Sequence, residues 1–282
     1  MEKISVIGAG TMGAGIAQAS ALAGYEVVLY DISEEVLQTA VASIHTSIDK
    51  GVERGKTAVE SAETAKASFT LTTSLADAAQ CDLIIEAAPE KLPMKRQIFG
   101  ELEAHAPQHT IFASNTSSLS INVLAAATGR QDKFIGLHFF NPAHVMKLVE
   151  VIRGDFTSED TVEAAMAYVE RLGKTAVLCK DTPAFIVNRV ARPFYGEAFR
   201  LLGENAADHA TIDKLLKSLG FRMGPFELID LIGCDVNFAV TQSVYEAYFQ
   251  EPKYRPHPIQ QRMVESGRLG RKTGRGFYDY SE

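Results

Sequence analysis

The sequence has few of the features that mark secreted, membrane-bound or metal-dependent proteins. Only three cysteines occur among its 282 residues: Cys81, Cys179 and Cys234. Their odd number, wide spacing and mostly apolar surroundings are typical of reduced packing residues in a cytoplasmic protein. No CxxC pair is present, so we expect no metal site. No apolar run reaches the roughly 20 residues of a membrane helix. Because a predicted strand begins within the first three residues, we expect no signal peptide.

Positive charge is also scarce. The chain has 28 Lys and Arg against 35 Asp and Glu, which gives a formal net charge of −7. Such a balance provides no general attraction to nucleic acid or to anionic membranes. Hydrophobic residues make up 46% of the chain and charged residues 22%, as in ordinary globular proteins. The length is sufficient for one or two domains.

The sequence does contain a dinucleotide-binding pattern within residues 3–31. A short β-branched run leads directly into a glycine-rich turn, a helix of small residues follows, and a second apolar run ends on Asp31. This order of strand, turn, helix, strand and acid is the one that the dinucleotide fingerprint requires. The turn consists of Gly8, Ala9, Gly10, Thr11, Met12 and Gly13.

Each part of this pattern has a mechanical reason. Gly8 permits a tight turn, Gly10 lets the backbone approach a pyrophosphate, and Gly13 lets the helix pack closely on the strand. The phosphates would then lie at the helix N-terminus, where unpaired N–H groups favour anions. Asp31 is placed to accept hydrogen bonds from the adenosine ribose, and its charge repels a 2′-phosphate. The pattern therefore predicts NAD(H) as the cofactor in preference to NADP(H).

Strands and helices alternate up to about residue 178. This alternation predicts an α/β fold with a Rossmann-type, doubly wound, mostly parallel sheet. The further strands are expected at 69–72, 82–86, 110–113, 134–140, 147–152 and 175–178, and helices at 33–54, 91–105 and 159–172. From residue 183 the pattern becomes helical. We therefore predict an NAD-binding domain at 1–182 and an all-helical domain at 183–282, whose helices are expected at 184–202, 208–219, 225–231, 235–249 and 258–265.

His138 and Glu150 form a candidate catalytic pair. His138 ends one predicted strand and Glu150 lies twelve residues later in the next, so the two would face each other if the strands fold back as neighbours. A carboxylate on one imidazole nitrogen fixes the tautomer and stabilises the imidazolium, so the other nitrogen can take a proton from an alcohol. The spacing is equally consistent with a structural pair, and His144 is a competing candidate for the base.

The chain resembles the L-3-hydroxyacyl-CoA dehydrogenases, and most closely the short-chain 3-hydroxybutyryl-CoA dehydrogenases of bacteria. The resemblance covers essentially the whole chain. It rests on blocks such as GAGTMGAGIA (8–17), EAAPEKLPMK (86–95), FASNTSSLSI (112–121), GLHFFNPAHVMKLVEV (136–151), KDTPAFIVNRV (180–190), GPFELIDLIG (224–233) and GRKTGRGFYDY (270–280). It implies that His138 takes the proton from the 3-hydroxyl and that Glu150 orients and supports this histidine. It also implies that Ser117 and Asn188 contact the 3-oxygen and the thioester region of the substrate.

The resemblance also implies cofactor and coenzyme A contacts. For NAD it adds Glu90, Lys95, Ser117, Asn141 and Lys272 to the glycine-rich turn and Asp31. For coenzyme A it implies Ser47 with the basic residues Lys50 and Arg54, which follow at helical spacing on one face. Judged by charge alone, this face could equally be a solvated helix surface.

These observations predict an NAD-dependent (S)-3-hydroxyacyl-CoA dehydrogenase that acts on short chains such as 3-hydroxybutyryl-CoA and acetoacetyl-CoA. The cysteine content favours a cytoplasmic location, and the resemblance implies a homodimer that pairs through its helical domain. One alternative is a related dehydrogenase of a free 3-hydroxy acid, such as a sugar acid, which has no need of Lys50 and Arg54 together. The other alternative is a non-enzymatic NAD-binding protein, in which decay of the His138, Glu150, Ser117 and Asn188 set is expected.

Overall fold

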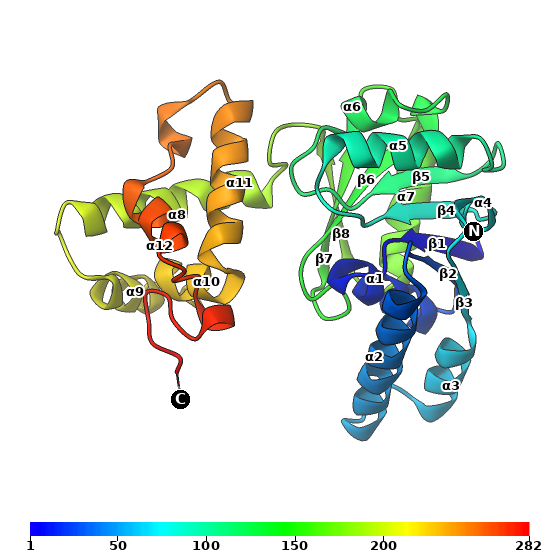
Figure 1. Cartoon of the computed structure of the whole chain (residues 1–282), viewed down its shortest axis with the longest axis horizontal. Coiled ribbons are helices and arrows are strands. Elements are labelled where there is room, and N and C mark those ends of the chain that lie inside the picture. The colour runs from blue at the N-terminus through cyan, green and yellow to red at the C-terminus, as the bar shows by residue number, and fades with distance from the viewer. Residues whose placement is uncertain (282) are drawn as a thin grey trace. The chain divides into compact units, whose positions relative to one another are not determined.

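The structure is a computed structural model that describes residues 1–281 (Figure 1). The chain divides into two compact units, Met1–Thr182 and the segment from Pro183 onward. The first unit is α/β and the second is helical, as the sequence pattern predicts. No helix among residues 1–281 is long and apolar enough to cross a membrane.

The first unit is organised around one eight-stranded sheet with the order β3-β2-β1-β4-β5-β6-β7-β8. All neighbouring strands pair in parallel except β6 and β7, which are antiparallel. The strand order reverses between β1 and β4, and the crevice at such a switch point is where open α/β sheets bind dinucleotides. The strands are β1 (Lys3–Ile7), β2 (Glu26–Tyr30), β3 (Phe69–Thr72), β4 (Leu83–Glu86), β5 (Ile111–Ser114), β6 (Phe134–Phe139), β7 (Leu148–Arg153) and β8 (Thr175–Lys180).

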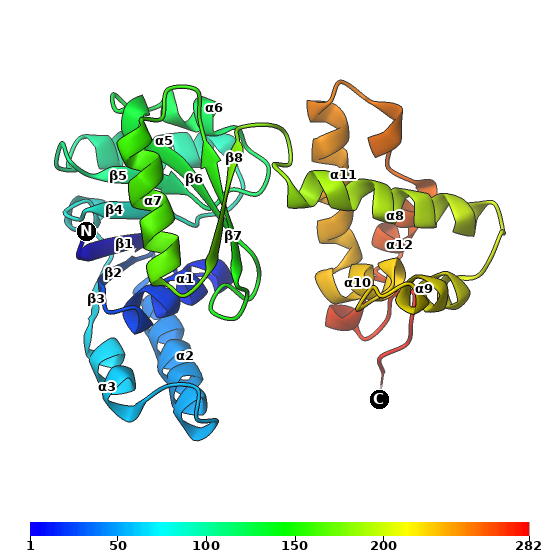
Figure 2. The same ribbon diagram turned by 180° about the vertical axis from the view of Figure 1, so that it is seen from behind.

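Helices cover both faces of this sheet (Figures 1 and 2). Alternate strand residues such as Val6 and Leu137 belong to a core shared with the helix residues Ile16 and Val169. On the other face, the ring of Phe99 packs against those of Phe112 and Phe134. The helices of this unit are α1 (Thr11–Leu22), α2 (Glu34–Glu53), α3 (Val59–Ala67), α4 (Leu75–Ala78), α5 (Leu92–Glu103), α6 (Ile121–Ala125) and α7 (Glu159–Arg171).

The second unit consists of helices around an aromatic core. Phe199, Phe226 and Phe277 pack ring against ring. Residues 270–280 form no continuous strand and fold back on the helices, where the buried Asp230 accepts hydrogen bonds from the amides of Phe277 and Tyr278 at 3.0 and 2.9 Å. The helices are α8 (Val187–Gly203), α9 (His209–Ser218), α10 (Pro225–Ile232), α11 (Cys234–Ala247) and α12 (Pro258–Glu265).

The beginning of α8 differs from the sequence prediction. The apolar spacing predicts a helix from residue 184, but α8 begins at Val187. Ala184 and Phe185 have φ values of 66° and 50°, in the left-handed region that a right-handed helix excludes. The backbone conformation, which no side-chain pattern specifies, therefore delays the helix by one turn.

Candidate active site

The glycine-rich turn between β1 and α1 has the shape that a pyrophosphate requires. A Cβ atom on Gly13 would lie 1.7 Å from the carbonyl oxygen of Gly8, so any larger residue at position 13 would displace the turn. Gly8 has φ +105°, and a Cβ there would approach Ala87 at 3.0 Å. In contrast, no protein atom lies within 4 Å of a Cβ placed on Gly10. Packing therefore requires the first and third glycines, while the open side of Gly10 fits a phosphate.

Asp31 lies at the end of β2 beside this turn. Its carboxylate accepts a 2.9 Å hydrogen bond from the amide of Ala9 and a 3.2 Å bond from the amide of Ser33. These two bonds fix the carboxylate at the turn while leaving acceptor capacity on both oxygens. The turn and Asp31 together fit the phosphates and ribose of NAD.

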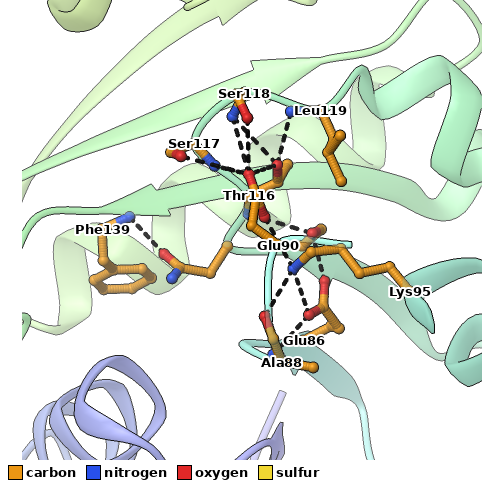
Figure 3. A network of polar contacts seen from close by, with 11 residues as sticks. Glu86, Ala88, Glu90, Lys95, Thr116, Ser117, Ser118, Leu119 and Phe139 are labelled. Atoms are coloured by element: carbon orange, nitrogen blue, oxygen red, sulfur yellow. Dashed lines mark hydrogen bonds and ion pairs between the residues drawn. The ribbon is translucent and has the colours of Figure 1, made fainter. Parts of the chain in front are cut away.

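A second group of polar residues lies at the carboxyl ends of β4 and β5 (Figure 3). Glu86, the last residue of β4, is fully buried and accepts hydrogen bonds from Lys95 Nζ at 2.6 Å and from Ser114 Oγ at 2.6 Å. Lys95 Nζ also lies 3.3 Å from Glu90 Oε2. The second oxygen of Glu90 accepts hydrogen bonds from the amides of Ser117 and Ser118 at 2.9 and 3.2 Å.

The two carboxylates of this group have pKa values shifted in opposite directions. Burial raises the pKa of Glu86, and the nearby Lys95 ammonium only partly opposes this effect. Burial also acts to raise the pKa of Glu90, but Lys95 and the hydrogen bonds from Thr116 and Ser117 outweigh it and lower the pKa. The site therefore favours an ionised Glu90 over an ionised Glu86.

His138 and Glu150 lie directly opposite each other on the antiparallel strands β6 and β7, as their spacing predicts. His138 Nδ1 lies 2.7 Å from Glu150 Oε2, and the two side chains are only 7% and 1% exposed. Because an ionised carboxylate can only accept, Nδ1 carries the proton and Nε2 is the basic nitrogen of the neutral ring. The Phe140 ring lies 4.5 Å from the imidazole, measured between centroids. This arrangement can take up and return a proton at Nε2.

His144, the competing candidate, has a different environment. It lies in the exposed segment between β6 and β7, where burial and the nearby Lys174 ammonium lower its pKa. No carboxylate partner of His144 is found among the described residues, so its ring lacks the orienting contact that His138 has. The geometry therefore favours His138 as the base.

The residues implied for coenzyme A lie at the C-terminal end of α2, where Ser47 is half-buried and Arg54 is the C-cap that follows the last helical residue. Ser47 Oγ accepts a 3.0 Å hydrogen bond from Gln18 of α1, which ties this position to the dinucleotide-binding helix. Lys50 and Arg54 are exposed, and neither has an ion-pair partner within residues 1–281. By contrast, the nearby Lys66 pairs with Asp49. Two unpaired cations near the end of one helix are suited to a phosphorylated ligand.

The structure groups the remaining implied residues by unit. Asn141 is exposed and lies just beyond β6 in the first unit. Asn188 and Lys272 belong to the second unit: Asn188 is half-buried in the first turn of α8, and its carbonyl accepts a 3.2 Å hydrogen bond from Arg192. Lys272 Nζ lies 2.6 Å from the carboxylate of Asp235.

The cysteines and histidines show no metal-binding arrangement. Within residues 1–281, no three His, Cys, Asp or Glu side chains are grouped to hold an ion. The three cysteines are free, and burial raises the pKa of Cys81 to about 11. His105 and His109 have the spacing of a metal-binding pair, but His109 instead contacts Asp82 at 3.2 Å.

Two family models match the chain in sequence. The NAD-binding domain of 3-hydroxyacyl-CoA dehydrogenase matches residues 3–182, and the C-terminal domain of the same enzyme matches residues 185–280. The chain belongs to the 3-hydroxyacyl-CoA dehydrogenase family. Its first unit is therefore an NAD-binding domain, in agreement with the predicted cofactor.

Relatives within the 3-hydroxyacyl-CoA dehydrogenase family cover the whole chain. The 3-hydroxyadipyl-CoA dehydrogenase of Escherichia coli is 47% identical over 99% of this chain, which spans only 59% of that protein. The 3-hydroxybutyryl-CoA dehydrogenase of Bradyrhizobium diazoefficiens is 45% identical over 99% of this chain and 96% of its own length. The crystal structure of (S)-3-hydroxybutyryl-CoA dehydrogenase from Ralstonia eutropha superposes with a TM-score of 0.96 over 100% of both chains, at 43% identity.

Glu86 is not among the site residues that the sequence predicts. The available signal was a carboxylate at the carboxyl end of a strand whose other residues are apolar (Leu83–Glu86). Its partner Ser114 is 28 residues away and lies beside it because β4 and β5 are neighbours in the sheet, whereas Lys95 follows only 9 residues later, in α5. A charged residue at the carboxyl end of an otherwise apolar strand thus indicates a buried polar network at that edge of the sheet.

Proposed function

We propose that this protein interconverts (S)-3-hydroxyacyl-CoA and 3-oxoacyl-CoA with NAD(H), acting on short acyl chains such as 3-hydroxybutyryl-CoA and acetoacetyl-CoA. The observation that carries the proposal is the buried 2.7 Å contact between His138 and Glu150 within a dinucleotide-binding fold. Bound NAD supplies the hydride acceptor in oxidation and the donor in reduction. The chain itself supplies the proton transfer, the orientation of both ligands and the charge that stabilises the transition state.

In the oxidative direction, Nε2 of His138 takes the proton of the substrate 3-hydroxyl. The Glu150 carboxylate holds the ring through Nδ1 and stabilises the imidazolium that forms. In reduction, the same imidazolium returns its proton to the developing 3-alkoxide. Ser117 and Asn188 are assigned to the 3-oxygen and the thioester region. The reaction is thus general acid–base catalysis beside a hydride transfer.

Most of the residues assigned to the two ligands belong to the first unit. The glycine-rich turn and Asp31 hold NAD, with Glu90, Lys95, Ser117 and Asn141, and Lys272 of the second unit, as further contacts. Lys50 and Arg54, with Ser47, bind the phosphorylated end of coenzyme A. Their lack of ion-pair partners within residues 1–281 supports this assignment, because a ligand can bind without displacing an acid.

The cofactor assignment predicts the effect of Asp31→Ala. This substitution removes the carboxylate that repels a 2′-phosphate, so discrimination against NADPH should relax. The measurement is the ratio of kcat/KM for NADH and NADPH in wild type and variant. An unchanged ratio would remove Asp31 from the cofactor site.

The proposed function is tested by NADH oxidation with acetoacetyl-CoA and, in parallel, with free acetoacetate. Turnover of the thioester alone supports a CoA-dependent enzyme. Turnover of acetoacetate as well would favour a dehydrogenase of free 3-hydroxy acids. It would also remove the reason for assigning Lys50 and Arg54 to coenzyme A. Absence of turnover with NADH still bound would indicate a non-enzymatic NAD-binding protein.

We further infer that the protein is a cytoplasmic homodimer that pairs through its helical unit. Large apolar side chains are exposed on this unit, among them Phe249 at 96%, Leu219 at 70% and Val190 at 69%. These side chains permit a dimer interface on this unit, as the resemblance to the 3-hydroxyacyl-CoA dehydrogenases implies. Light scattering after size-exclusion chromatography tests the dimer: a wild-type mass near 31 kDa, that of one 30.7 kDa chain, would contradict it. Fractionation of the producing cells tests the location.

A further inference from the structure

We propose that Glu86 is a positioning residue that acts through Lys95 and Glu90 on the turn that carries Ser117. The inference rests on the proposed function, since it assumes that Ser117 contacts the substrate. It concerns a residue that neither the fingerprint nor the implied cofactor contacts include. Figure 3 shows the three charged side chains in a row that leads to this turn.

The first link is the burial of Glu86. Its side chain is 0% exposed, and such a carboxylate is costly unless all its acceptors are used. Oε1 accepts from Lys95 at 2.6 Å and from the amide of Ala88 at 2.7 Å, and Oε2 accepts from Ser114 Oγ at 2.6 Å. Glu86 therefore joins the carboxyl ends of β4 and β5 to helix α5 at one point.

The second link is the enclosure of Lys95. Its Nζ donates hydrogen bonds to Glu86 Oε1 at 2.6 Å and to the carbonyl of Ala88 at 3.1 Å, and it forms an ion pair with Glu90 Oε2 at 3.3 Å. The side chain is 1% exposed. These three contacts hold the ammonium in place between the two carboxylates.

The third link is that the two oxygens of Glu90 have different partners. Oε2 pairs with Lys95, whereas Oε1 accepts hydrogen bonds from the turn after β5. The amides of Ser117 and Ser118 donate to Oε1, and so does Thr116 Oγ1 at 2.5 Å. The orientation of Glu90 therefore determines the path of the backbone at Ser117.

The same turn is also tied to the strand of the catalytic base. Asn115, which precedes Thr116, accepts a 2.9 Å hydrogen bond from the amide of Phe139, the residue after His138. A displacement of the turn thus changes the position of Ser117 and the support of β6 together. Two carboxylates that share one ammonium hold this turn in place without taking part in the proton transfer.

The test combines Glu86→Gln and Glu90→Gln in a double-mutant cycle. We expect Glu86→Gln to lower kcat/KM for acetoacetyl-CoA by about 10-fold, because small misplacements of a positioning group are costly. We call the contacts from Glu86 through Lys95 to Glu90 the relay. If both carboxylates act through this relay, kcat/KM of the double variant should be no lower than that of the more impaired single variant. Losses that multiply would overturn the proposal.

A matched control is available at the other end of α5 from Lys95. Glu103, the last residue of α5, pairs with the mostly buried Arg130 at 2.7 Å and makes no hydrogen bond or ion pair with the Ser117 turn within residues 1–281. Glu103→Gln should therefore lower the melting temperature without changing kcat/KM. If Glu86→Gln affects only the melting temperature, as this control does, the role of Glu86 is merely structural and the proposal fails.

Hydrogen exchange of the free protein separates this proposal from the proposed function. Glu86→Gln should accelerate exchange of the amides of Ser117 and Ser118 selectively, and Glu103→Gln should not. This readout needs no substrate. If the wild type does not reduce acetoacetyl-CoA but the selective exchange is seen, the proposed function fails and the relay stands. Unchanged exchange at both amides would overturn the relay whatever the activity.

Discussion

Two buried glutamates in the NAD-binding domain have different nitrogen partners. Glu150 and Glu86 are 1% and 0% exposed, and each accepts from a nitrogen at 2.6–2.7 Å. The partner of Glu150 is a histidine, a residue type that changes its charge near neutral pH. The partner of Glu86 is a lysine, a type that stays charged there. The comparison teaches that the nitrogen partner, and not the buried carboxylate, decides whether such a pair is suited to transfer a proton or to fix a conformation.

Removing the titratable partner should have the largest effect. His138→Gln keeps a hydrogen-bonding side chain but eliminates the base, so kcat should fall by roughly 10²–10⁴-fold. The affinity for NADH should not change, because His138 is not assigned to cofactor binding. Steady-state kinetics with acetoacetyl-CoA and NADH fluorescence titration measure the two quantities. A near-normal kcat in this variant would contradict His138 as the base and make His144 the candidate.

Removing the orienting carboxylate should have a smaller effect. Glu150→Gln leaves the base in place but no longer enforces the tautomer or stabilises the imidazolium. We expect kcat to fall by about 10–10²-fold, as for other residues that orient a reactive group. The double variant with His138→Gln should be no slower than His138→Gln alone, because Glu150 acts only through the histidine. A slower double variant would show a separate role for Glu150.

The smallest effect concerns the pH dependence of stability. The pKa of Glu90 is lowered in the folded state, so its ionisation stabilises the fold above about pH 4.3 and this contribution is lost as the pH falls. The pKa of Glu86 is raised by burial, so its contribution is present below about pH 4.3 and is lost as the pH rises through the raised value.

Urea unfolding of the variants between acidic and neutral pH checks these signs. Relative to wild type, Glu90→Gln should be most destabilising near neutral pH and least at acidic pH. Glu86→Gln should become relatively more favourable as the pH rises. Because Glu90 is about one third exposed, solvent screening keeps its contribution small. If the free energy of unfolding depended on pH in the same way in both variants, the pKa values of Glu86 and Glu90 would not be shifted in opposite directions.

Much of the site follows from local sequence rules. The glycine-rich turn and Asp31 could be found because the fingerprint lies within one strand–turn–helix–strand unit. The opposition of His138 and Glu150 follows from counting residues along two antiparallel strands, since the register repeats every two residues. The change from alternating strands and helices to helices alone locates the helical unit.

The tertiary structure alone decided the rest. Ser114 and Ser117 meet Glu86 and Glu90 across 27–28 residues because β4 and β5 are neighbours in the sheet. Likewise, α8 begins only at Val187 because Ala184 and Phe185 adopt left-handed backbone conformations. Periodicity reports which face of an element is apolar, but it carries no information about which elements become neighbours. The opposition of His138 and Glu150 was therefore readable in the sequence, whereas the contacts of Glu86 and Glu90 with the residues after β5 became visible only once the strand order was known.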